Sequence, residues 1–221
     1  METAVQLSNR RSYVRPGKQR RARRRARTRL EILRAASRVF RVRGYAASGM
    51  REIALAADLS PGNLYHYFRS KTEILFFCQD GTLDRLIAAL VTARKSREAI
   101  YVRLRGLALS HVLCLIDEVE GSAAHFEVDA LPRAMRAAIV KKRDAYERGV
   151  RSLVTAGMRR GEFRRGDATI VTRAYLGALN WTAHWFRPEG SQSPAHVAQL
   201  VADYAVGGLT GAGRRAKGRR A

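Results

Sequence analysis

The chain has 221 residues, 46% of them hydrophobic, and carries a formal net charge of +23 at pH 7. That length allows one large domain or two small ones with a packed core. No apolar run approaches the roughly 20 residues of a membrane span, and no apolar segment follows the basic N-terminus as in a secretory signal. The two cysteines, Cys78 and Cys114, lie far apart in apolar stretches, which is typical of buried reduced thiols in a cytoplasmic protein.

The positive charge is concentrated at the two ends of the chain. Eleven of the first 30 residues are Lys or Arg, against the single acid Glu2, and five more lie between Arg214 and Arg220. Because blocks of like charge repel one another, we expect a disordered basic arm at 1–25 and a basic tail at 211–221. Two interpretations remain open: solvated disorder, or phosphate contacts that raise affinity for nucleic acid without reading its sequence.

A first amphipathic helix is predicted at about 28–42, with Gly44 as its C-terminal stop. A short helix follows and carries Ile53 and Ala54 on one face. The turn after it, at 58–59, is expected to be tight.

A second short helix begins after this turn. Ser60 is its predicted N-cap and Pro61 its first residue, while Leu64 and Phe68, four residues apart, face inward. This layout is a helix-turn-helix, whose second helix fits the major groove of DNA and presents its N-terminal side chains to base edges.

The segment resembles the DNA-binding domain of the TetR family of bacterial repressors over about residues 26–86. The resemblance rests on Gly44-Tyr45, the runs 50–54 and 59–68, and Ser70-Lys71. The family often has glycine in the turn where this chain has Asp58, a residue that tolerates a left-handed backbone.

The resemblance implies an all-α protein with an N-terminal three-helix helix-turn-helix domain and, at 87–210, a C-terminal helical ligand-binding and dimerisation domain. It also implies which residues contact DNA: Ser48, Gly49, Arg51, Ser60, Pro61, Gly62, Asn63, Tyr65, Tyr67 and Lys71. Tyr67 and Lys71 are expected to hold phosphates, which position the protein without specifying sequence. For both tyrosines the alternative is packing between helices.

Beyond this domain a capping box, Ser70 with Glu73, begins a fourth helix that runs past Leu90. Further helical segments are predicted at 97–119, 132–161, 167–186 and 193–209. The resemblance implies that the last two pair with their copies in a homodimer. They contain small residues that allow close packing: Ala174, Gly177, Ala178, Ala202 and Ala205.

Both tryptophans lie in the segment 167–186, next to polar side chains. Such a stretch suits either a ligand pocket or a dimer interface, and both remain open. It is similar to the C-terminal region of TetR-type repressors that respond to acyl-CoA thioesters, which implies such a thioester as the effector, with Arg173 and Arg187 at the CoA phosphates. The candidate ligand residues are Arg173, Asn180, Trp181, His184, Trp185 and Arg187.

We therefore expect a ligand-responsive transcriptional regulator in the cytoplasm, associated with the nucleoid. It would be a repressor that binds a palindromic double-stranded DNA operator as a homodimer and is released by a small molecule. The alternative is a sequence-indifferent, basic nucleic-acid-binding architectural protein. An enzyme is not expected, nor are catalytic residues, a metal or a cofactor, because the five histidines lack metal spacing and no Gly-rich phosphate loop is present.

Overall fold

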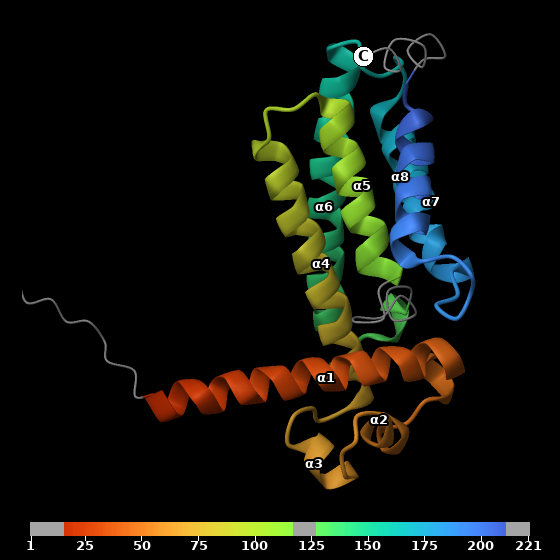
Figure 1. The fold of residues 1–221 in the computed structure, drawn as a ribbon. Helices are drawn as coiled ribbons and strands as arrows, with labels where there is room; N and C mark the ends of the chain where they lie inside the picture. Colours follow the sequence, from red (N-terminus) through yellow and green to blue (C-terminus); the bar gives the residue numbers. More distant parts are fainter. Residues whose placement is uncertain (1–15, 117–126, 211–221) are drawn as a thin grey trace, which may run out of the picture.

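The computed structural model describes residues 16–116 and 127–210, and within these ranges the chain forms helices and no strand. The elements are α1 (Pro16–Ala47), α2 (Met50–Ala56), α3 (Pro61–Tyr65), α4 (Lys71–Lys95), α5 (Ile100–Ile116), the short 3-10 turn η2 (Val128–Ala130), α6 (Arg133–Arg159), α7 (Ala168–Trp185) and α8 (Pro194–Gly207). Figure 1 shows α1 to α3 at one end and an upright bundle of α4 to α8 above them. The predicted all-α fold is confirmed.

The N-terminal domain is held together by one face of α1 packed against α2 and α4, while α2 in turn packs against α3. Ile32 and Phe40 of α1, Ile53 of α2, and Leu64 and Phe68 around α3 are all buried. The inward orientation predicted for Leu64 and Phe68 is confirmed. Burying each of these large side chains contributes about 1.5–3 kcal/mol, which fixes the position of a five-residue helix that would not persist alone.

The start of α1 differs from the sequence-based expectation. Residues 16–25, expected to belong to a disordered arm, continue the helix, while residues 1–15 and the tail at 211–221 lie outside the described residues. Arginine is a good helix former. Once packing has nucleated a helix, each further residue loses its backbone freedom but gains one hydrogen bond, so the helix can lengthen. These local terms outweigh the repulsion between guanidinium groups. At its other end α1 is interrupted at Gly44, whose φ of 76° and ψ of 157° no β-carbon-bearing residue adopts easily.

In the bundle, α5 packs against α4, α6, α7 and α8 and is buried along most of its length. The Tyr175 hydroxyl of α7 donates to the Leu104 carbonyl of α5 over 2.9 Å, and Arg105 of α5 pairs with Asp203 of α8. Both C-terminal helices have N-caps: Asp167 accepts from the first-turn amides of α7, and Ser193 from that of α8. The segments predicted at 97–119, 132–161, 167–186 and 193–209 thus correspond to α5, α6, α7 and α8.

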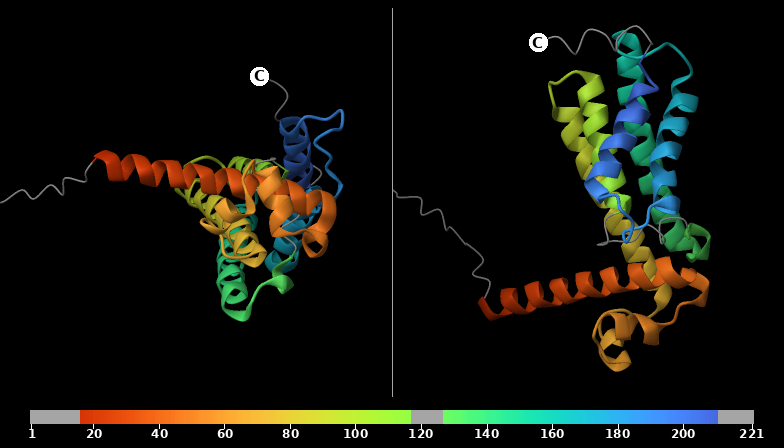
Figure 2. Two further views of the ribbon diagram at one scale, coloured as in Figure 1. Left: turned by 90° about the horizontal axis from the view of Figure 1, so that it is seen from below. Right: turned by 45° about the vertical axis from the view of Figure 1, so that its right-hand side comes forward.

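The pair α7 and α8 and the N-terminal half of α1 lie on opposite sides of the molecule. The two C-terminal helices run along one side of the bundle, and α1 projects beyond the other, in Figure 1 and in both views of Figure 2. None of the described helices is long and apolar enough to cross a membrane.

Candidate functional site

The second helix of the helix-turn-helix, α3, is built by local interactions that the sequence encodes. Asp58 in the preceding turn has a φ of 54°, the left-handed conformation expected for it. The Ser60 hydroxyl accepts a hydrogen bond from the Asn63 amide over 3.2 Å, and Pro61 occupies the first turn. With Leu64 anchored in the core, the opposite face of α3 points into solvent.

That outward face contains most of the residues predicted to contact DNA. Ser60, Pro61, Gly62, Asn63 and Tyr65 are all exposed. Tyr65 has 53% of its surface accessible, so packing between helices does not explain this ring. Tyr67 is half-buried and packs against the core, so that the packing alternative accounts for part of its surface. Arg51, at the start of α2, is also exposed.

Lys71 does not have the free ammonium group expected of a phosphate contact. Its Nζ donates to three backbone carbonyls, those of Tyr45 (2.7 Å), Ala46 (3.2 Å) and Ser48 (2.8 Å), and lies 4.4 Å from the centre of the Tyr45 ring. An ammonium has three N–H donors, and all three are used here. The structure therefore corrects this prediction: Lys71 fastens the junction between α1 and α2 to the start of α4.

Ser48 and Gly49 are also engaged within the domain. The Ser48 side chain is buried and donates to the Tyr45 carbonyl over 2.9 Å. The Gly49 amide donates to the Glu52 carboxylate over 2.6 Å, and Glu52 in turn pairs with Arg43. Because both donors already have partners, these two residues shape the first helix of the motif, and the DNA contact expected of Gly49 does not fit this arrangement.

A second candidate site is a partly open cavity of about 280 Å³ between helices of the bundle. In its wall the buried imidazole of His111 lies 3.0 Å from the Tyr146 hydroxyl, through Nδ1, and 3.0 Å from Asn180 Oδ1, through Nε2. The lining residues come from α4, α5, α6 and α7: Leu83, Leu86, His111, Arg143, Tyr146, Glu147, Leu176 and Asn180.

The protonation states of His111 and Tyr146 follow from their burial. Desolvation lowers the pKa of His111 to about 4, even though the hydrogen bond to Asn180 favours the charged form, and burial raises the pKa of Tyr146. At pH 7 the imidazole is neutral, with one donor and one acceptor nitrogen. Because Asn180 Oδ1 can only accept, Nε2 carries the proton and Nδ1 accepts from Tyr146. The cavity thus offers neutral hydrogen-bonding groups, the Arg143 guanidinium and the Glu147 carboxylate, beside three leucines.

Only one of the six predicted ligand residues lines this cavity, namely Asn180. Trp181 and Trp185 are exposed over 62% and 48% of their surfaces, and Arg173 is exposed on the same helix. His184 stacks on Trp181 with ring centres 4.4 Å apart, while Arg187 donates to the carbonyls of His184 and Phe186. The prediction of a pocket formed by these residues is therefore wrong in its details: Arg173, Trp181, His184 and Trp185 are exposed on α7, and Arg187 follows its end.

The sequence reasoning missed His111, Arg143 and Tyr146, because the cavity forms only where four helices meet. One signal was available: His111 interrupts an otherwise apolar face of its helix, which is where a buried polar group needs partners from other helices.

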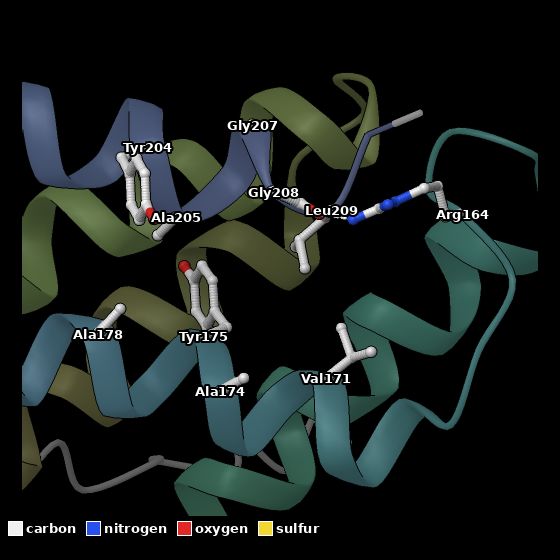
Figure 3. Close-up of a pocket in the computed structure, with 10 residues that line it drawn as sticks. All are labelled: Arg164, Val171, Ala174, Tyr175, Ala178, Tyr204, Ala205, Gly207, Gly208 and Leu209. Carbon is white, nitrogen blue, oxygen red and sulfur yellow. Dashed lines mark hydrogen bonds between the residues drawn. The ribbon is translucent and has the colours of Figure 1, made fainter. Parts of the chain in front are cut away.

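The outer surface of α7 and α8, hereafter the α7–α8 face, exposes large apolar side chains: Ile170, Trp181, Trp185, Leu200 and Tyr204. A groove of about 430 Å³ runs between the two helices, and half of the residues that line it are alanine or glycine, with Tyr175 pointing from α7 towards α8 (Figure 3). Of the small residues expected to permit dimer packing, Ala174 and Gly177 are exposed here, whereas Ala202 and Ala205 are buried within the chain. Large apolar side chains exposed on two neighbouring helices are typical of an interaction site.

No group of three or more His, Cys, Asp or Glu side chains that could hold a metal ion occurs among residues 16–116 and 127–210. His125 lies outside these ranges.

Both halves of the chain match models of known protein families. Residues 32–76 match the family described as "Bacterial regulatory proteins, tetR family", and residues 100–209 match "Tetracyclin repressor-like, C-terminal domain". The transcriptional repressor KstR2 of Mycobacterium tuberculosis H37Rv is 28% identical over 188 residues, which cover 81% of this chain and 92% of that protein. These relatives are transcriptional regulators.

Solved structures give the same picture. PfmR, a TetR family transcriptional regulator from Thermus thermophilus, superposes with a TM-score of 0.72 and 30% identity, covering 81% of this chain and 99% of PfmR. AibR in complex with isovaleryl coenzyme A and operator DNA has a TM-score of 0.67 at 24% identity, covering 82% of this chain and 97% of AibR, and shares the fold. The comparisons favour a sequence-reading regulator over an architectural protein.

Proposed function

Because the chain belongs to the TetR family of bacterial regulatory proteins and is a ligand-responsive DNA-binding transcriptional regulator, we propose that it acts as a homodimeric repressor. In this proposal α3 reads one half of a palindromic operator on the nucleoid, and a small molecule in the bundle cavity releases the DNA. The observation that carries it is that one helix, α4, serves both sites. Its first turn is fastened to the helix-turn-helix through Lys71, and its middle lines the cavity with Leu83 and Leu86.

Dimerisation through the α7–α8 face is supported by its composition. Aromatic residues are enriched in protein interfaces, and Trp181, Trp185 and Tyr204 are among the most exposed apolar side chains of the described chain. The exposed Ala174 and Gly177 let a partner helix approach closely. A dimer places two copies of α3 at a fixed separation, which a palindromic site requires.

The effector is proposed to place a small, mainly apolar group in the cavity, with a hydrogen-bonding end against His111 and Asn180. A volume of about 280 Å³ is at the lower end of ligand pockets and too small for a whole coenzyme A thioester. An acyl-CoA effector, the class found with AibR, would therefore have only its acyl portion inside. Its nucleotide portion would have to lie outside the cavity.

Release follows if the effector binds better to a bundle in which α4 is displaced. Such a ligand changes the equilibrium constant between the two states by at most the ratio of its affinities for them. Lys142 of α6 pairs with Asp80 and Asp84 of α4, so movement between these helices is transmitted through specific contacts. Because α4 holds the helix-turn-helix, its displacement changes the separation of the two reading helices.

The test uses fluorescence anisotropy of the full-length protein on its operator, titrated with a panel of acyl-CoA thioesters. Leu176→Trp fills the cavity and should keep operator binding while abolishing release, and Asn180→Ala should weaken release without filling it. The matched control Val102→Trp adds the same ring at an exposed position of α5 and should respond like the unaltered protein. Release that persists unchanged in both cavity variants would show that the effector binds elsewhere.

A further inference from the structure

The core-facing side of α1 changes character along the helix. Ile32, Ala36 and Phe40 are buried against the rest of the N-terminal domain. Eleven residues make about three helical turns, and the residues eleven positions before Phe40, Ala36 and Ile32 are Arg29, Arg25 and Arg21, which therefore continue the same face. The face that is apolar inside the domain is thus cationic where the helix projects beyond it. We call these three residues the arginine stripe.

Arg29, the residue of the arginine stripe nearest the core of the domain, is held in place by aromatic rings. The Arg29 guanidinium lies 4.5 Å from the centre of the Phe68 ring and 4.6 Å from that of Phe77. Such cation–π contacts orient the arginine and join α1 to the segment following α3 and to α4. The projecting turns of α1 are therefore held at a defined angle to the reading helix.

A cleft of about 390 Å³ lies between the arginine stripe and the end of α3, lined by Arg21, Arg24, Arg25, His66 and Tyr67. Every lining side chain can donate a hydrogen bond and none is a carboxylate. The arginines are exposed. A concave surface with three guanidinium groups and no carboxylate among its lining side chains, next to a helix that reads DNA, is complementary to a phosphate backbone.

The direction in which α1 projects selects which part of the DNA it would meet. The N-terminal half of α1 points away from the side that carries α7 and α8 (Figures 1 and 2). In a dimer joined at the α7–α8 face, the two arginine stripes therefore point outward. The helical stretch from Arg21 to Arg29 is about 12 Å long, the length of roughly four base pairs.

We propose that the arginine stripe binds the phosphate backbone of the DNA flanking each operator half-site, outside the major groove read by α3. This inference rests on the proposed function, because it needs α3 on the DNA and a dimer joined at the α7–α8 face. It extends the binding site outward without adding sequence preference, since phosphate contacts do not distinguish bases.

The experiment compares two duplexes by fluorescence anisotropy at ~150 mM salt. One ends at the outer edges of the half-sites, and the other is extended by ten base pairs of arbitrary sequence on each side. The variant R21A/R25A removes the outer stripe, and R23A/R27A removes two exposed arginines with the same spacing on the opposite side of the helix. Both variants lose the same charge and gain the same helix-forming residue. The surface pair of Arg27 with Glu31 contributes little, so its loss does not disturb the control.

The unaltered protein and R23A/R27A should bind the extended duplex at least about 10-fold more tightly than the short one, and R21A/R25A should bind the two equally. Raising the salt from ~50 to ~200 mM weakens binding of both proteins to the extended duplex. The loss of affinity should be about 100-fold smaller for R21A/R25A than for the unaltered protein, because the variant lacks four phosphate contacts per dimer. The proposal would be overturned if both variants lost affinity for the extended duplex equally, or if the unaltered protein bound the two duplexes equally. In either case a persisting preference for the operator sequence would leave the proposed function intact. Loss of preference for the operator itself would instead refute the proposed function.

Discussion

Replacing Lys71 by methionine should destabilise the N-terminal domain, because the ammonium ties three carbonyls of the α1–α2 junction to α4. Hydrogen bonds from a charged donor contribute about 1.5–3 kcal/mol each. The Ala46 carbonyl is exposed and can be rehydrated, whereas the bonds to Tyr45 and Ser48 are partly buried. Counting only these two gives a loss of about 3 kcal/mol. Methionine keeps the length of the side chain, so lost packing adds little.

For a chain of this size about 3 kcal/mol corresponds to a fall in Tm of about 6–12 °C, measurable by differential scanning calorimetry without DNA. The control is Arg51→Met, which removes an exposed positive charge from the same domain and should change Tm by less than about 2 °C. On operator DNA, Arg51→Met should reduce the salt slope by about 1 per protomer, as expected for a lost phosphate contact. If Lys71→Met leaves Tm unchanged and gives that same reduction in slope, Lys71 is a phosphate ligand after all and the structural role assigned to it is wrong.

Three other outcomes are expected. Since burial lowers the pKa of His111 from 6.5 to about 4, the stabilisation from its neutral form is complete above pH 6.5 and is lost as the pH falls towards 4. The free energy of unfolding should drop there by about 3 kcal/mol more than in His111→Gln, measured by urea denaturation, and parallel pH profiles would contradict this. Gly106→Ala, at an exposed helical position with open space around it, should raise stability by up to about 1 kcal/mol in the same assay, and a loss of stability would show that the site is crowded. Gly177→Ala has the same open surroundings in one chain, yet on the α7–α8 face it should weaken dimerisation in sedimentation velocity at least about 10-fold, whereas unchanged association would place the dimer contact elsewhere.

The parts of the structure that could be predicted from sequence depend on local interactions. The caps at Ser60, Asp167 and Ser193 join residues two or three positions apart, so the beginnings of α3, α7 and α8 can be predicted from the local sequence. The left-handed backbone at Asp58 was also predictable from its residue type.

What could not be predicted depends on residues far apart in sequence. His111 meets Tyr146 and Asn180, 35 and 69 residues away, only after four helices have packed. Likewise, nothing in the motif shows that Lys71 is used by carbonyls 23 to 26 residues before it. The tryptophans of α7 indicate a ligand pocket or a dimer interface, but helical spacing alone does not say which side of the helix faces a cavity.

Whether α3 reads a sequence is tested most directly by fluorescence anisotropy at ~150 mM salt. The full-length protein is titrated onto the intergenic DNA upstream of its own gene and onto a scrambled duplex of equal composition. Recognition by an oriented α3 predicts a preference of about 10³-fold or more for the intergenic DNA, and Tyr65→Ala should reduce that preference with little change on the scrambled duplex. Equal affinity for both duplexes would contradict sequence reading by α3 and leave the basic segments as the source of binding.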